Sequence, residues 1–256
     1  TLRITQQIAP AVPVTVQQAT FTRIAGKYEV AVTQPAGALP GKGGLEISLS
    51  PKLANPPPGL KRFFEEYPFG CLEQKTSIAV GLHDEKRWQQ IADTLPGYLD
   101  GNGLASYFPG SAGSATLTAY ILDLVTLAGF TIPEDSRQRM LQGLTAYVEG
   151  RIKTAEWAPT DSLLPRRLNA LQALTRQGNK PTRAAAALEI DPLRLSTATL
   201  IDWYLVTQRL TDLPQRDKKL ADAKQELRNR LSYAGSRLVF TTEREDYWWW
   251  MMINAD

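Results

Sequence analysis

Cysteine and histidine are almost absent from this sequence. Its 256 residues contain one cysteine, Cys71, and one histidine, His83. A single cysteine excludes an internal disulfide and a metal site built on a cysteine cluster, so we expect neither a metal nor a cofactor. A Ser-His-Asp or Cys-His catalytic arrangement would have to use His83 alone.

Charge of one sign and long apolar runs are also missing. The 29 basic residues are interleaved with 26 acidic ones, which leaves a net charge of +3. Without a dense basic stripe, we expect no nucleic-acid partner. No apolar run is long enough to span a bilayer, and no secretory signal opens the chain. Hydrophobic residues make up 43% of the sequence, enough to bury a substantial core.

The first 55 residues are typical of β-structure. Three segments, 11–16, 28–32 and 45–49, are rich in β-branched residues or alternate apolar and polar side chains. Glycine and proline separate these segments, as expected of turns. This is too little sheet to close a sandwich, so we expect residues 1–55 to complete a β-domain that continues outside the fragment. A run of three prolines, 56–58, marks the boundary, because proline disfavours helix interiors and stiffens linkers.

After this boundary the hydrophobic pattern changes to a helical period. Gly129 is expected to end one helix, and Pro133 to open the next. The pattern predicts helices over 60–67, 71–82, 85–99, 114–128, 134–153, 161–176, 183–188, 195–210 and 215–231.

The predicted helices alternate in character. Helices 114–128 and 195–210 are apolar almost all round, whereas helices 134–153 and 215–231 are amphipathic and charged. Buried helices that alternate with surface helices favour two concentric layers, an α/α toroid, over a simple bundle or a solenoid. The predicted fold class is therefore mainly α, with a small β segment before the toroid.

The end of the sequence is rich in aromatic residues. A short strand is expected over 236–241, and three of the six tryptophans stand within 246–252. We interpret this run as core packing at the entry to another helix. A platform for an aromatic ligand is the second interpretation.

The stretch 67–74 reads Tyr-Pro-Phe-Gly-Cys-Leu-Glu-Gln. It places Cys71 at the start of a predicted helix, where the helix dipole favours a thiolate. Cys71 and Gln74 are three residues apart and therefore share a helix face. Attack of the sulfur on the Gln74 side-chain carbonyl, with loss of ammonia, would form an internal thioester. On the Cys-x-x-Gln spacing alone, an inert buried cysteine is the favoured interpretation.

The longer stretch resembles the thioester motif of the alpha-2-macroglobulin and complement superfamily in its bacterial form. Segments 10–14, 38–44, 117–123 with 128–130, and 241–252 resemble other parts of the same region, so the likeness covers most of the chain. The resemblance implies that residues 1–55 belong to a β-sandwich domain of the CUB type. It implies that residues 56–256 form the thioester domain, an α/α toroid whose last helices are expected to be missing.

The resemblance also implies roles for individual residues. Cys71 and Gln74 would form the thioester cross-link, and Tyr67 matches an aromatic residue that shields the bond. Phe69 beside it is a second candidate shield, and ordinary packing is the alternative role for Tyr67. The remaining motif residues are Gly70, Leu72 and Glu73, and we expect Glu73 to be a first-turn residue without a chemical part. His83 does not match the histidine that some complement members use, which implies direct attack by amines.

The implied function is that of a protease inhibitor, which traps proteases and acylates their amines once, so it is not an enzyme. The resemblance implies a periplasmic location, with envelope or peptidoglycan-synthesis proteins as possible partners and a membrane anchor outside this fragment. Two alternatives stay open. The chain could be a non-covalent scaffold module of an envelope complex, with no active thioester. It could instead be an α/α-toroid enzyme, but the carboxylates of Asp161 and Asp202 show no pairing and are expected to be capping or solvated groups.

Overall fold

The computed structural model describes residues 24–34, 36–41, 43–45, 47, 49, 58–152, 163–234 and 237–240. The chain divides into two units, Thr1–Asn55 and Pro56–Asp256. All helices and strands found among the described residues belong to the second unit. The assignment of the two units to a CUB-type domain and a thioester domain stays a prediction.

The described residues of the first unit form no strand. Tyr28, Val30 and Val32 carry the alternating pattern at 28–32, yet they are 46%, 62% and 59% exposed. A strand is held by hydrogen bonds to a neighbouring strand, and the described residues of this unit pair with none. The predicted strand at 28–32 is therefore wrong, and so is that at 45–49 for its described residues. No β-sandwich is seen there, and segment 11–16 lies outside the described residues.

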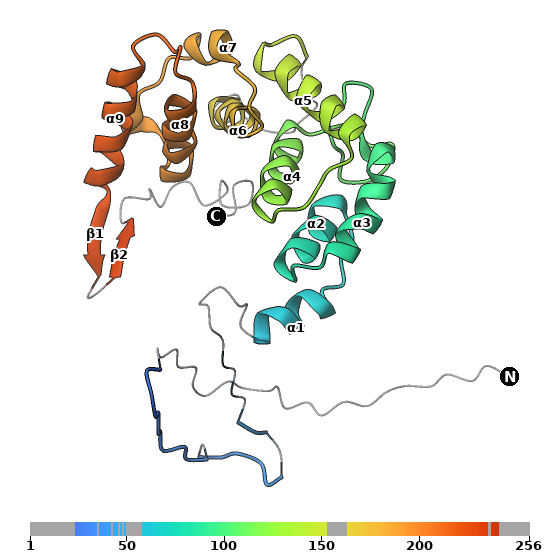
Figure 1. Ribbon diagram of the computed structural model, residues 1–256, viewed down its shortest axis with the longest axis vertical. Helices are drawn as coiled ribbons and strands as arrows, with labels where there is room; N and C mark the ends of the chain where they lie inside the picture. The colour runs from blue at the N-terminus through green and yellow to red at the C-terminus, as the bar shows by residue number, and fades with distance from the viewer. Residues whose placement is uncertain are drawn as a thin grey trace, which may run out of the picture. The chain divides into compact units, whose positions relative to one another are not determined.

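The second unit is mainly helical, as predicted from the period of its apolar residues (Figure 1). Its described part contains nine α-helices, two short 3₁₀-helices and two strands. In chain order they are α1 Pro58–Glu66, α2 Leu72–Gly81, α3 Glu85–Thr94, η1 Leu95–Tyr98, α4 Ala115–Leu127, α5 Glu134–Val148, α6 Leu163–Arg176, α7 Thr182–Ala186, η3 Pro192–Arg194, α8 Thr197–Arg209, α9 Arg216–Asn229, β1 Leu231–Ala234 and β2 Arg237–Phe240.

The helices of this unit form an arc of two layers. Helices α2, α4, α6 and α8 line its inner side and pack on one another in that order, while α3, α5, α7 and α9 lie outside them (Figure 1). The inner α4 buries seven of its 13 residues, whereas the outer α9 buries only Ala223. An apolar helix needs cover on several sides, and a charged helix does not, so composition decides the layer.

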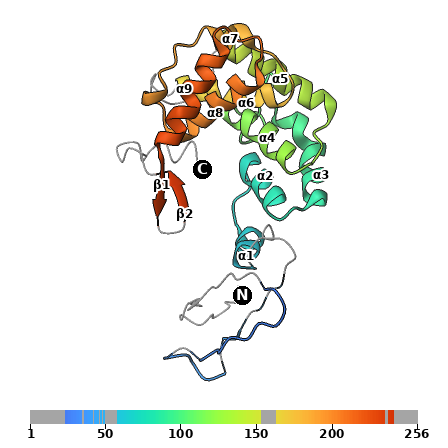
Figure 2. The ribbon, with the colours of Figure 1, turned by 60° about the vertical axis from the view of Figure 1, so that its left-hand side comes forward.

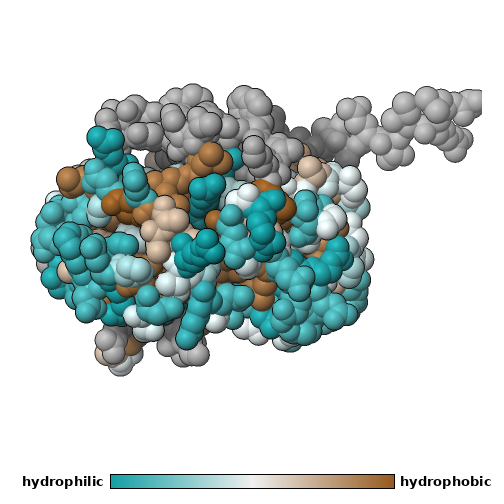
Figure 3. Space-filling model, turned by 90° about the horizontal axis from the view of Figure 1, so that it is seen from above, coloured by the Kyte–Doolittle hydropathy of each residue, from teal (hydrophilic) through white to brown (hydrophobic). Residues whose placement is uncertain are grey.

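Two other views show the outer surface and the end of the arc. The face seen from above is mostly hydrophilic, with hydrophobic side chains showing between the polar ones (Figure 3). The hairpin of β1 and β2 continues from the end of α9 (Figure 2). Among the described residues, no helix combines the length and apolarity that a membrane crossing requires.

Helix ends differ from the predicted bounds where local chemistry stops the helix. Helix α5 ends at Val148 rather than at residue 153, because Gly150 adopts a left-handed φ of 73°. The predicted helix 85–99 changes to the 3₁₀-helix η1 at Leu95, and Pro96 is the second residue of η1. Helix α9 ends at Asn229, and β1 begins two residues later at Leu231. Arg230 between them is buried, and its guanidinium donates to the carbonyls of Pro192 and Leu195 at 3.0 and 2.9 Å.

The final predicted strand exists, with an unpredicted partner. Residues 237–240, within the predicted strand 236–241, form β2, which pairs antiparallel with β1 in a register that places Leu231 opposite Phe240. Leu231, the first residue of β1, was expected to be the last residue of a helix. The aromatic run at 246–252 lies outside the described residues.

Candidate functional site

The stretch 67–74, which resembles a thioester motif, leads into the N-terminus of α2. Cys71 is the N-cap residue, with the extended backbone angles of −70° and 167° that a cap requires. Leu72 follows it with no exposed surface, and its backbone N–H donates to the Tyr107 carbonyl at 3.0 Å. Burial of Leu72 therefore anchors the start of the helix, and with it the position of Cys71.

The structure brings Cys71 and Gln74 together across one helical turn. The Cys71 backbone N–H donates to Gln74 Oε1 at 3.2 Å, and the Cys71 side chain faces the Gln74 backbone N–H, as in a capping box. Cys71 is 8% exposed and Gln74 is partly buried. The carbonyl of the Gln74 side chain is thus held beside the residue that bears the thiol.

An open pocket of about 570 Å³ lies over this turn. Phe69, Tyr107 and Phe108 are 62%, 44% and 58% exposed and give it an aromatic rim. Of the two predicted shielding residues, Phe69 lines the pocket, whereas Tyr67 lies behind it, with its ring 5.5 Å from that of Phe69 and 5.2 Å from that of Phe63. The pocket is lined by Pro68, Phe69, Gly70, Cys71, Glu73, Gln74, Tyr107 and Phe108.

The loop between η1 and α4 supplies two of the aromatic rim residues. One carboxylate, Asp100, holds the loop by accepting from the backbone N–H groups of Asn102, Leu104 and Gly113 at 2.8, 2.9 and 3.2 Å. The sequence did not point to this loop, because its approach to Cys71 is a tertiary contact. An Asp followed by glycines was the only available signal, and it indicates a turn rather than a site.

Glu73 has a partner that its position in the motif does not predict. Its carboxylate accepts from Ser77 Oγ at 2.8 Å, and Ser77 Oγ lies 2.8 Å from Tyr120 Oη on α4. Burial raises the pKa of the Tyr120 hydroxyl, the hydrogen bond to Ser77 lowers it, and the nearby Glu73 charge raises it again. The pKa of Tyr120 lies above its usual value overall, so its hydroxyl stays a donor. The spacing of Glu73 and Ser77 signals a contact within α2, whereas nothing in the sequence signals Tyr120.

His83 lies at the far end of the same helix. It follows the C-terminus of α2 with a φ of 51°, is exposed, and stacks on Phe130 at 5.3 Å between ring centroids. The ten residues of α2 separate it from Cys71, roughly 15 Å at the rise of an α-helix. His83 is therefore a surface residue and is not part of the pocket.

A second polar cluster joins the inner helices α4, α6 and α8. Asp123 forms an ion pair with Arg176 at 2.9 Å, and the charges of Asp202 and Arg209 lie close enough to shift one another's pKa values. Burial and the neighbouring Asp123 raise the pKa of Asp202 to about 7. The expectation that Asp202 is a capping or solvated carboxylate is therefore wrong, because packing of α8 on α6 leaves the residue partly buried and its carboxyl desolvated. Asp161 lies outside the described residues.

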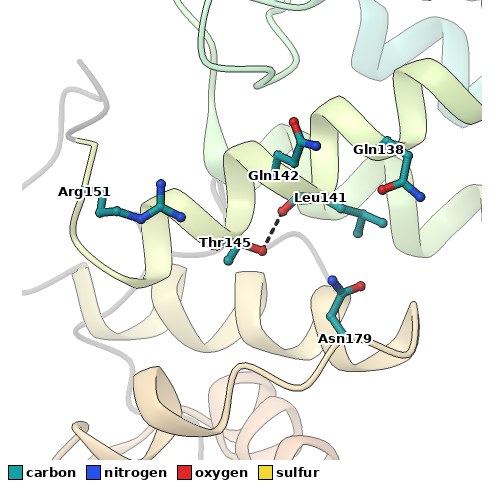
Figure 4. Close-up of a pocket in the computed structure, with 6 residues that line it drawn as sticks. All are labelled: Gln138, Leu141, Gln142, Thr145, Arg151 and Asn179. Carbon is teal, nitrogen blue, oxygen red and sulfur yellow. Dashed lines mark hydrogen bonds between the residues drawn. The ribbon is translucent and has the colours of Figure 1, made fainter.

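A further pocket, of about 360 Å³, lies between α5 and the turn after α6 (Figure 4). Amide, hydroxyl and guanidinium groups line it, and Thr145 Oγ1 donates to the Leu141 carbonyl at 2.7 Å. It contains no carboxylate, thiol or imidazole that would give it chemistry of its own. Within the described part of the chain, no group of three His, Cys, Asp or Glu side chains is placed to hold a metal.

Comparison with known proteins gives a fold likeness. No family model and no curated protein matches the sequence. The crystal structure of native alpha-2-macroglobulin from Escherichia coli, from domain MG7 to the C-terminus, matches 65% of the chain with a TM-score of 0.53 and 22% identity. The matched part of the chain has the fold of a region of this bacterial alpha-2-macroglobulin.

A cryo-EM reconstruction of the native conformation of E. coli alpha-2-macroglobulin gives the same result. It matches 66% of the chain with a TM-score of 0.52 and 23% identity. The match covers 30% of the crystallised alpha-2-macroglobulin chain and 12% of the chain in the cryo-EM structure. The likeness thus concerns one region of a much larger protein.

Proposed function

We propose that the chain is the thioester-bearing region of a bacterial alpha-2-macroglobulin-like protease inhibitor. The observation that carries the proposal is the Cys71–Gln74 pair, in a chain with the fold of alpha-2-macroglobulin. In this proposal residues 56–256 form the thioester domain, with its helices arranged as an α/α toroid, and residues 1–55 belong to a CUB-type domain. The location is periplasmic, and the partners are proteases and proteins of the cell envelope.

The geometry supports formation of the bond from groups already in place. The Cys71 sulfur attacks the Gln74 side-chain carbonyl carbon, the carbon–nitrogen bond breaks, and the thiol proton leaves with ammonia. The Cys71 backbone N–H already donates to Gln74 Oε1 at 3.2 Å. The same N–H stabilises the negative charge that develops on this oxygen during the attack.

The product is an activated acyl group that reacts once. A lysine amine of the target attacks the acyl carbon, an amide forms, and the Cys71 sulfur is released. Because the acyl group is consumed, the chain is an inhibitor and not an enzyme. Water must be excluded until the target arrives, and the aromatic rim formed by Phe69, Tyr107 and Phe108, with Tyr67 behind Phe69, is suited to that role.

A second function has one observation in its favour. Cys71 is 8% exposed, and a buried cysteine commonly acts as a small hydrophobic residue. In that case the chain is a non-covalent scaffold module of an envelope complex, and its aromatic rim is a contact surface.

Covalent capture distinguishes the two functions. The purified chain is incubated with a lysine-rich protein target, and conjugates that survive boiling in detergent are counted by gel and mass spectrometry. The proposed function predicts an amide between Gln74 and a target lysine in the wild type, and none in Cys71→Ala. Equal labelling of the two proteins, or none in either, contradicts the covalent function and favours the scaffold.

A further inference from the structure

The reaction proposed above needs a group that accepts a proton. When a neutral amine attacks the Gln74 acyl carbon, the new carbon–nitrogen bond leaves a positive charge on the nitrogen. A proton must depart from this nitrogen before the amide is stable, while the sulfur leaves as a thiolate with its electron pair. Groups that take such protons commonly contribute about 10²- to 10⁴-fold to a rate.

We propose that the Glu73 carboxylate is this proton acceptor and that Ser77 and Tyr120 are its positioning residues. The inference rests on the proposed function and deepens it. It assigns a chemical part to Glu73, which was expected to serve the helix dipole alone. In the completed step the C–N bond forms, the C–S bond breaks, and the amine proton passes to Glu73 and then to solvent.

The residues that line the pocket indicate which group can accept the proton. Besides the reacting pair, Cys71 and Gln74, its side chains are a proline, three aromatic residues and Glu73. Glu73 is thus the one carboxylate among the lining residues, and imidazole is absent from that set. His83 is separated from the pocket by the length of α2.

Hydrogen bonds fix the orientation of the Glu73 carboxylate. Ser77 Oγ donates to Glu73 Oε1 at 2.8 Å, so the hydroxyl of Tyr120, at 2.8 Å, is the donor to Ser77 Oγ. The chain of donors runs from α4 through α2 to the carboxylate and ends at the pocket. Ser77 Oγ also lies 2.8 Å from the Glu73 backbone carbonyl, which locks its rotamer.

The charges that the described residues place around Glu73 leave its carboxylate without a neutralising partner. The titratable groups that face Glu73 are Tyr120 from α4 and, around the pocket, Cys71 and Tyr107. Lys75, two residues along α2, is turned away, with its Nζ donating to Tyr98 Oη at 3.1 Å. Among the described residues none forms an ion pair with Glu73, so its negative charge is available to draw in the cationic side chain of a target lysine.

The test compares amine reaction rates in proteins that have formed the thioester. Methoxyamine is used as the probe, since it remains a neutral nucleophile in mildly acidic solution. Its incorporation is followed by intact mass from acidic to neutral pH. For Glu73→Gln we expect a rate about 30- to 100-fold lower and a pH profile that differs from that of the wild type, because the carboxylate is missing. Glu73→Asp should recover part of the rate and the pH dependence.

The positioning residues have a different expected signature. Ser77→Ala and Tyr120→Phe should lower the rate about 3- to 10-fold and keep the shape of the pH profile, because the carboxylate is still present. Glu85→Gln is the matched control, since Glu85 is also a first-turn acid, on α3, outside the pocket. We expect it to react like the wild type.

The outcomes separate this inference from the proposed function. A wild type without a thioester defeats both. In another outcome, the wild type and Glu73→Gln both form the thioester and react at the same rate with the same pH profile. That result overturns the role of Glu73 but supports the thioester. If Glu73→Gln forms no thioester, the role of Glu73 is tested with Ser77→Ala and Tyr120→Phe. Methoxyamine reaction rates equal to that of the wild type in both variants overturn the inference.

Discussion

The N-terminus of α2 and the charged cluster of α4, α6 and α8 are two polar sites on one inner layer of helices, built in opposite ways. The first comes from eight consecutive residues, 67–74, with an added aromatic loop, and it opens to solvent through a pocket. The second joins Asp123, Arg176, Asp202 and Arg209 from three helices, and its charges compensate one another. A partly buried acyl donor beside an open pocket, as proposed for Gln74, suits reaction with a partner. Compensated, largely buried charge suits attachment of one helix to the next.

The largest expected difference between the two sites is chemical. Gln74→Ala removes the proposed acyl donor. It should abolish both the decrease in mass that accompanies loss of ammonia on thioester formation and all amine incorporation. The fold should persist, because Gln74 is only partly buried. Intact mass and thermal unfolding measure the two effects. Gln138→Ala, which removes an exposed glutamine from α5, serves as the control. Amine incorporation that survives in Gln74→Ala would assign the acyl group to another residue.

The next effect concerns stability at the charged cluster. Asp123→Ala leaves the partly buried Arg176 without its ion-pair partner, 2.9 Å away in the wild type. We expect a loss of about 2–3 kcal/mol in the free energy of unfolding, without a change in amine reactivity. Asp222→Ala breaks the exposed ion pair with Lys218 and should cost no more than about 0.5 kcal/mol. Equal losses in denaturant titrations of the two variants would contradict a structural role for the cluster.

The aromatic loop offers a smaller effect that belongs to the pocket. Asp100→Ala removes three hydrogen bonds to backbone N–H groups of the loop. We expect a loss of about 1.5–2 kcal/mol and faster hydrolysis of the thioester, because the loop that carries Tyr107 loosens. The half-life of the mass deficit in buffer measures the second effect. A half-life equal to that of the wild type would show that the loop does not shield the bond.

The smallest effect is a pH dependence at Asp202. The pKa of Asp202 in the folded chain, about 7, lies above the ordinary aspartate value of 3.8, so the folded chain holds this proton more tightly than the unfolded chain does. The resulting stabilisation is complete below pH 3.8 and is lost as the pH rises through about 7. Asn cannot lose this proton, so the advantage of Asp202→Asn over the wild type should grow steadily from about pH 4 to about pH 7 and stay constant above about pH 8.

Thermal or denaturant unfolding across this pH range checks the prediction for Asp202. Asp217→Asn is the control, since the side chain of Asp217 is 93% exposed. A constant difference between Asp202→Asn and the wild type from pH 5 to pH 8 would contradict the buried position of the carboxylate.

The same contrast explains what could be predicted from the sequence. Helix positions and the two layers followed from hydrophobic period, as for α4 and α9, and the contact of Cys71 with Gln74 followed from helical spacing. Asp123 and Asp202 are 79 positions apart and meet only because α4 and α8 pack on α6, so no local pattern predicts their proximity. The prediction of a strand at 28–32 was wrong for a related reason. Alternation of apolar and polar side chains marks a segment that can pair, but it does not supply the strand with which it would pair.

The central claim is the acyl bond between Cys71 and Gln74, and the intact mass of freshly purified protein tests it most directly. Loss of ammonia makes the chain about 17 Da lighter than its sequence. The account predicts this deficit in the wild type, its replacement by a methylamine adduct with a newly titratable thiol, and no deficit in Cys71→Ala. A wild type with the full sequence mass, a free thiol and no reaction with methylamine would contradict it.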